Sequence, residues 1–182
     1  VFAGVVKRAR AAVAVLIGLM ISIPSFVAAS FLIGTFAVAL GWFPPFGAGT
    51  PGVDRIWHLT LPAIALSIGW IAYLGQITGA SVAEESGKEH VSTAVGRGLP
   101  YRTILGRHIL RNAGIPVITG AGLTLAALLA GSIVVETAFG VDGIGSLLVV
   151  SVLSKDQPVV AAISLIIIVV FVIMTTLGDI IH

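Results

Sequence analysis

The stretch Ser81–Pro116, SVAEESGKEHVSTAVGRGLPYRTILGRHILRNAGIP, decides the fold because it is the one long polar run between segments almost free of charge. It holds five of the ten basic residues and three of the eight acidic residues. Four of its residues recur at helical spacing on one face: Tyr101, Ile104, Leu105 and His108. Pro100 suits the first turn of that helix, where a missing N–H costs nothing. A basic, helical loop with an apolar face predicts a docking element, since a plain connector needs only a few polar residues.

The composition indicates a membrane protein with several spans. Of the 182 residues, 57% are hydrophobic and 10% are charged, and the mean hydropathy is +1.11. The absence of Cys excludes a disulfide framework and a thiolate metal site. The formal net charge of +2 is too small to indicate nucleic-acid binding. The predicted fold class is therefore an all-α membrane protein, with residues 1–182 forming a single transmembrane domain.

Four charge-poor segments predict transmembrane helices, at about 11–40, 58–82, 114–135 and 157–178. Residues 83–113, called the central loop below, join the second segment to the third. The first segment is longer than a hydrocarbon core of ~30 Å requires, so we expect one span with an interfacial extension. Pro24 predicts either a plain kink in it, with a neighbouring helix or Ser22 and Ser25 bonding the freed carbonyl, or the hinge of a gate.

The remaining segments differ in composition. Gly, Pro and aromatic residues predict a loop at 41–57, with Trp42 and Trp57 at the membrane–water interface. The Gly- and Ala-rich third segment predicts an inner position beside a translocation path, whereas the Ile and Val of the fourth predict contact with lipid. A short surface helix is expected near 147–152, inside a polar connection.

The distribution of Lys and Arg predicts the orientation. Three lie near the N-terminus and five in the central loop, whereas Arg55 and Lys155 lie on the other side. By the positive-inside rule, the central loop and both ends of this chain are expected in the cytoplasm. An intracellular partner can then reach the central loop.

Enzyme chemistry is not indicated. Gly87-Lys88 is followed by Glu89, so the phosphate-binding pattern G-x4-G-K-[ST] fails and no ATP site is expected. Glu85, Glu89 and His90 are interpreted as a solvated helix face and not as metal ligands. No Ser or Thr has an identifiable base, so no catalytic residue is assigned.

Polar residues in or beside the spans are candidates for lining a path. For Gln76 and Thr78, a hydrogen bond to a neighbouring helix is favoured over a path-lining role. Asp179 is interpreted as an interfacial anchor. For Glu136, a structural cap and a path-lining role stay equally open.

One part of the central loop resembles the cytoplasmic coupling loop of ABC-transporter permease subunits, whose general pattern is E-A-A-x3-G-x9-I-x-L-P. This part consists of Ser92–Gly98, nine further residues and His108–Asn112. The resemblance is strongest to the B-type subunit of the dipeptide/oligopeptide/nickel branch, in which departures such as Ser92, Thr93 and Arg111 are usual. It continues through 22–26, 41–44, 134–139 and 143–145. Asp142 stands where the family usually has Pro.

This resemblance implies a polytopic helical bundle of the ABC-importer permease type in the bacterial inner (plasma) membrane, lacking the first two of six spans. It implies a translocation path for short peptides, working by alternating access. The implied partners are a second permease subunit, two ATP-binding subunits that hold ATP and Mg, an extracytoplasmic substrate-binding protein and the lipid bilayer. The alternatives are an ATP-independent carrier or channel, or the same system carrying nickel chelates or another small solute. The expected ATPase-coupling residues are Ser92, Thr93, Ala94, Gly98, Leu99, Pro100, Leu105, Arg107, His108, Arg111 and Asn112.

Overall fold

The computed structural model describes the backbone of residues 2–181 and the side chains of residues 12–125 and 127–176. Every regular element in that part of the chain is helical, which confirms the predicted all-α class. The side chains of the N-terminal basic cluster and of Asp179 lie outside the described residues, so the orientation expected from the first and the anchoring role expected of Asp179 stay predictions.

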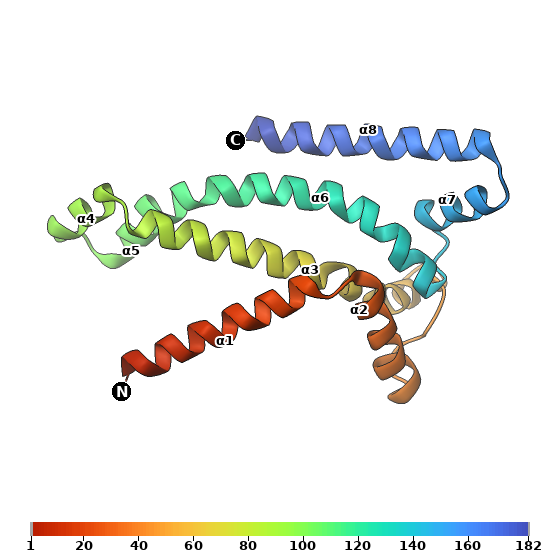
Figure 1. The fold of residues 1–182 in the computed structure, drawn as a ribbon, viewed down its shortest axis with the longest axis horizontal. Helices are drawn as coiled ribbons and strands as arrows, with labels where there is room; N and C mark the ends of the chain where they lie inside the picture. Colours follow the sequence, from red (N-terminus) through yellow and green to blue (C-terminus); the bar gives the residue numbers. More distant parts are fainter. Residues whose placement is uncertain (1, 182) are drawn as a thin grey trace.

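The arrangement is a row of long helices. Helices α3 (Val53–Ser86) and α6 (Arg111–Phe139) lie side by side in the middle, with α1 (Phe2–Ser22) packed against α3 and α8 (Gln157–Ile181) against α6 (Figure 1). The start of α1 and the end of α8 lie toward the end that carries α4 (Glu89–Gly96) and α5 (Tyr101–Thr103) (Figure 1).

The number of spans depends on how bent helices are counted. Among the described residues, Val53–Ser86 and Gln157–Thr176 are each long and apolar enough to cross a membrane. The number rises to four if each of two bent pairs forms one span, the first around Pro24 and the second around residue 126. Four spans therefore stay a prediction.

The first charge-free segment is broken at Pro24. Helix α1 meets α2 (Ser25–Leu32) and the π-helix η1 (Ile33–Ala39) at 97°, so the expected plain kink is wrong. Pro24 has no N–H to bond the Met20 carbonyl, and it pushes Ile23 out of the helical conformation. Ser22 does not replace that bond, because its hydroxyl donates to the Gly18 carbonyl at 2.8 Å.

The largest apolar core lies where α2, η1, α3 and α6 meet, at the end opposite the central loop. Leu61 of α3 and Phe139 of α6 are both 1% exposed at its centre. Small residues of α2, such as Ala28 and Ala29, bring that short helix against them. Side chains of this kind stabilise a helix bundle in a membrane through close van der Waals packing.

Two glycines of α6 allow α3 to approach closely. A Cβ on Gly120 would lie 2.9 Å from Ile77 Cδ1, and one on Gly131 would lie 3.1 Å from Leu66 Cδ1. This contact fits the inner position expected for the third segment. By contrast, α8 leaves most of its large side chains exposed in this chain, as a lipid-facing helix would.

The boundaries of two connections differ from the sequence prediction. The expected loop at 41–57 ends earlier, because α3 begins at Val53. Asp54 in its first turn accepts hydrogen bonds from the Thr50 N–H at 2.7 Å and the Thr50 hydroxyl at 3.0 Å, which stabilises the helix N-terminus. The third segment is longer than expected, since α6 runs on to Phe139.

Helix α6 ends in a tight turn that leads to α7 (Ile144–Leu153). Gly140 has a φ of 59°, and the Val141 N–H donates to the Glu136 carbonyl at 2.9 Å, which is a Schellman ending. The turn brings the start of α7 so close to α6 that a Cβ on Gly145 would lie 2.6 Å from Ile133 Cα. The short helix expected near 147–152 is confirmed as α7, although it starts three residues earlier.

Gly145→Ala should lower the thermal midpoint of the protein in detergent, measured by Trp fluorescence. The added methyl group meets backbone, which cannot give way as a flexible side chain can, so we expect a loss of about 1–3 kcal/mol. Gly79→Ala is the matched control: Gly79 is exposed on α3 with nothing within 4 Å of its Cβ position. Equal midpoints for the two variants would show that the α6–α7 turn is not closely packed.

Candidate functional site

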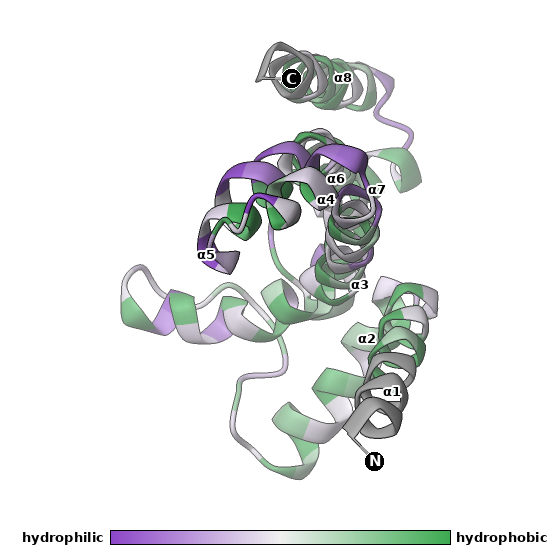
Figure 2. Cartoon of the chain, turned by 90° about the vertical axis from the view of Figure 1, so that its left-hand side faces the viewer, coloured by the Kyte–Doolittle hydropathy of each residue, from purple (hydrophilic) through white to green (hydrophobic). Residues whose placement is uncertain are grey.

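The central loop forms a compact helical unit at one end of the molecule. After α3 ends at Ser86, α4 follows, a turn at 97–100 reverses the chain, and α5 continues into the π-helix η2 (Ile104–Leu110). Helix η2 passes into α6 without a break. Figure 2 shows that hydrophilic residues gather over this end of the chain.

The turn after α4 is set by Gly98. Its φ is 73°, in the left-handed region that favours glycine. The Leu99 N–H donates to the Ala94 carbonyl at 3.3 Å and the Gly98 N–H to the Val95 carbonyl at 2.9 Å, which together form a Schellman motif. A helix–turn–helix is therefore present around Gly98, and Pro100 lies at the N-cap of α5.

A small apolar cluster holds the two arms of the central loop together. Val91 and Ala94 of α4 pack against Ile104 and Ile109 of η2, and all four are at most 5% exposed. The predicted apolar face was partly wrong, because Tyr101 is 73% exposed. The physical reason is the π-helix, whose i→i+5 bonding widens each turn and puts Ile104 and Ile109 on one face.

Most other expected coupling residues lie on the outer surface of the loop. The Ser92 and Thr93 hydroxyls donate to the Glu89 carbonyl at 2.8 and 2.9 Å, and both residues are exposed. Arg107 and Arg111 are also exposed. A shallow groove of about 320 Å³ brings several of the candidates together; it is lined by His90, Thr93, Ala94, Arg97, Leu99 and His108.

Apolar side chains at the tip of the loop are open to a partner. Val95 is 60% exposed, Leu99 39% and Tyr101 73%. They lie beside exposed basic residues such as Arg97. Apolar and basic groups mixed on a rigid turn are suited to contact with another protein.

The structure reveals an ionic site that the sequence interpretation missed. Glu85, expected on a solvated face, is 4% exposed. Its Oε1 accepts a hydrogen bond from Asn112 Nδ2 at 2.7 Å and lies 3.1 Å from His90 Nε2. Its Oε2 pairs with the Lys88 ammonium. The i, i+3 spacing of Glu85 and Lys88 was the one local signal for this cluster, since Asn112 lies far along the chain.

Glu85, Lys88, His90 and Asn112 are called the Glu85 cluster below. Their proximity changes the pKa of Lys88. The hydrogen bond to the Glu85 carboxylate raises the pKa of Lys88 above its ordinary value. The ammonium is therefore charged throughout the physiological range.

One of the two path candidates on α3, Thr78, bonds its own helix. The Thr78 hydroxyl donates to the Leu74 carbonyl of its own helix at 2.7 Å, so the favoured interhelical bond is wrong for this residue. A hydroxyl one turn from a carbonyl finds that partner without any second helix. Gln76 is exposed on the same helix, and both the interhelical bond favoured for it and its path-lining role stay predictions.

Glu136 caps a helix. Its Oε2 accepts a hydrogen bond from the Ser146 N–H at 3.0 Å, in the first turn of α7. Gly143 permits this approach, because a Cβ there would overlap the Glu136 carboxylate. The structure therefore gives Glu136 the structural cap considered above. A path-lining role stays a prediction.

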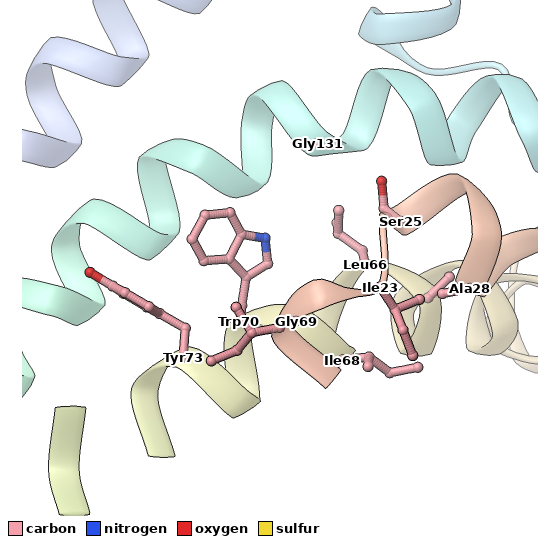
Figure 3. A pocket seen from close by; sticks show the side chains of 11 residues that line it. Ile23, Ser25, Ala28, Leu66, Ile68, Gly69, Trp70, Tyr73 and Gly131 are labelled. Atoms are coloured by element: carbon pink, nitrogen blue, oxygen red, sulfur yellow. The ribbon is translucent and has the colours of Figure 1, made fainter. Parts of the chain in front are cut away.

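A pocket of about 270 Å³ lies beside the break at Pro24, between α2, α3 and α6 (Figure 3). Trp70 and Tyr73 of α3 line it at one end, with ring centroids 6.0 Å apart and ring planes at 88°. Ser25 lines it from the start of α2 and Gly131 from α6. Among the described residues, no group of His, Cys, Asp or Glu is arranged to hold a metal ion.

Comparison with known proteins identifies related sequences. Residues 1–182 match the family described as "Binding-protein-dependent transport system inner membrane component". The glutathione transport system permease protein GsiC of Shigella flexneri is 38% identical over 162 residues, which are 89% of this chain and 51% of that protein. The oligopeptide transport system permease protein OppB of Salmonella typhimurium is 37% identical over 145 residues, 80% of this chain and 46% of that protein. The dipeptide transport system permease protein DppB of Bacillus subtilis is 37% identical over 159 residues, which are 87% of this chain and 50% of that protein. The chain thus spans about half the length of these relatives.

Glu136→Ala should lower the thermal midpoint, because the N-terminus of α7 loses its carboxylate acceptor. We expect a cost of about 0.5–2 kcal/mol, as for other lost caps. Glu136→Gln keeps an acceptor oxygen and should lose less. An Ala variant of unchanged stability but altered transport would contradict the cap and favour the path-lining role.

Proposed function

Since the chain belongs to the family of binding-protein-dependent transport system inner membrane components, we propose that it forms part of the translocation path of an ATP-driven importer for short peptides. The observation that carries this proposal is the family match over the whole chain. The relatives named above are permease proteins of glutathione, oligopeptide and dipeptide transport systems, which supports the peptide class. The chain is a translocation subunit and not an enzyme, and ATP and Mg²⁺ bind in separate subunits.

The proposed partners are a second permease subunit, two ATP-binding subunits and an extracytoplasmic substrate-binding protein. An open face of α3 supports the second permease subunit, because small residues let a partner helix approach closely. Gly75 and Gly79 on this face have nothing within 4 Å of their Cβ positions, and Gln76 lies exposed between them. The exposed apolar side chains of α8 suit the lipid bilayer.

The proposed mechanism is alternating access. Closure of the ATP-binding subunits moves the central loop, and α3 and α6, which leave that loop, exchange an outward opening for an inward one. ATP can bias this equilibrium only through contacts that differ between the two states. The small apolar cluster of Val91, Ala94, Ile104 and Ile109 holds the loop together, and the Gly98 turn fixes its tip. Such a loop is suited to carry these contacts to α3 and α6.

A reporter fused after Gly87 should lie in the cytoplasm, and one fused near Gly49 should lie outside. The reason is the excess of Lys and Arg in the central loop and near the N-terminus, which places both ends of this chain in the cytoplasm. Reporter activity in whole cells measures this directly. An external Gly87 fusion would reverse the proposed orientation in the inner membrane.

Gly98→Val and Leu105→Asp should leave the subunit in the membrane but abolish substrate-stimulated ATP hydrolysis by the assembled complex. Valine at a φ of 73° costs about 1–2 kcal/mol and distorts the turn. Aspartate at 105 places a charge against the apolar cluster. ATP hydrolysis and peptide uptake in proteoliposomes are the measurements.

Two matched controls separate coupling from general damage. Gly96→Val changes a helical glycine that also has open space, and Leu105→Met keeps the apolar volume. Both should retain most stimulation, and Arg107→Ala or Arg111→Ala should have smaller effects than Gly98→Val. Normal stimulation of ATP hydrolysis and normal peptide uptake in the Gly98→Val and Leu105→Asp complexes would show that the central loop does not couple ATP hydrolysis to transport. Peptide uptake without any ATP would favour an autonomous carrier.

A further inference from the structure

We propose that Glu85 is a positioning residue that fixes α3 to the central loop, so that movement of the loop reaches both α3 and α6. This inference rests on the proposed function, because it concerns how the subunit responds to ATP binding and hydrolysis in its partner subunits. It assigns a role to a residue that the loop pattern does not include.

The partners of Glu85 come from every segment that meets at the base of the loop. Glu85 itself lies in the last turn of α3, Lys88 in the turn that follows, and His90 in the first turn of α4. Asn112, 27 residues along the chain, lies in the first turn of α6. One carboxylate of α3 therefore contacts α4, α6 and the turn that follows α3.

The burial of Glu85 makes these contacts specific. A carboxylate that is 4% exposed has its acceptor sites filled by these partners, and the loss of one of them leaves a largely buried charge with fewer hydrogen bonds. The adjacent Glu84 is the opposite case. Its side chain is 78% exposed, and its one ion pair reaches Lys88 only at 4.0 Å, so it contributes little.

The two long helices are joined to the loop in different ways. Helix α6 continues from η2 without a break, so it must follow the loop. Helix α3 is separated from α4 by the Gly87–Lys88 turn and adds only Val82 to the apolar cluster. The Glu85 cluster is therefore the polar link on the α3 side, and its loss should loosen the end of α3 at the base of the loop, while the packing of α3 on α6 farther along is kept.

The test compares Glu85→Ala with the matched control Glu84→Ala in the assembled complex in proteoliposomes. Glu85→Ala should lower the ratio of peptide transported to ATP hydrolysed by about fivefold or more, as expected when one coupling contact is lost. Glu84→Ala should keep the ratio of the unmodified complex. Glu85→Gln retains an acceptor for Asn112 and removes the charge, so its ratio of peptide transported to ATP hydrolysed should lie between those of the two Ala variants. It replaces Glu85→Ala in the test if that variant does not fold.

A donor–acceptor exchange gives a sharper test. Asn112→Asp alone places two carboxylates face to face and should lower the ratio as Glu85→Ala does. Adding Glu85→Gln restores an amide–carboxylate pair with the roles reversed, and the double variant should regain most of the ratio. Failure of the double variant to improve on Asn112→Asp would count against a direct Glu85–Asn112 link.

A distance measurement makes the result independent of transport. The chain has no Cys, so spin labels can be attached at introduced cysteines replacing Ala80 on α3 and Val95 on α4, both exposed. The distance distribution should be narrow in the unmodified and Glu84→Ala proteins and broad in Glu85→Ala. A narrow distribution in Glu85→Ala, with an unchanged transport ratio, would overturn the proposal. If the unmodified complex proves independent of ATP, the proposed function fails, and the label distances still decide whether Glu85 holds the loop.

Discussion

The close contact between α3 and α6 is the interaction on which the rest of the structure depends. Gly120 and Gly131 remove the side chains that would keep the two helices apart, so Ile77 and Leu66 of α3 can pack directly on α6. The remaining long helices are added to this pair, α1 against α3 and α8 against α6. Because a helix satisfies its own backbone hydrogen bonds, such a pair can form in lipid and needs only side-chain packing to be specific.

The two ends of this pair are held by different chemistry. At one end, Leu61 and Phe139 are buried in an apolar core, and the tight α6–α7 turn lets Glu136 cap α7. At the other end, the Glu85 cluster joins the helices through a buried carboxylate, and a small apolar cluster closes the central loop. Apolar packing tolerates small adjustments, whereas a buried ionic contact has few alternative partners.

That break also shapes the candidate path. The 97° angle between α1 and α2 leaves a pocket whose wall includes Trp70 and Tyr73 (Figure 3). Interrupted helices in membrane proteins are tolerated where the backbone faces protein or a water-filled cavity. The expected path candidates Gln76 and Thr78 lie farther along the same helix, so α3 carries both groups of residues.

The sequence by itself determined the helical class, the polar central loop and the family, since composition, periodicity and motif spacing are properties of neighbouring residues. Only the tertiary structure decided the sharp angle at Pro24, the π-helical register that pairs Ile109 with Ile104, and the own-helix bond of Thr78. It also decided the burial of Glu85, whose partner Asn112 is 27 residues away. The physical reason is that a helix closes its own hydrogen bonds within a turn, so its existence can be predicted locally. The partner of a side chain depends on which distant surfaces pack together, and no local pattern records that.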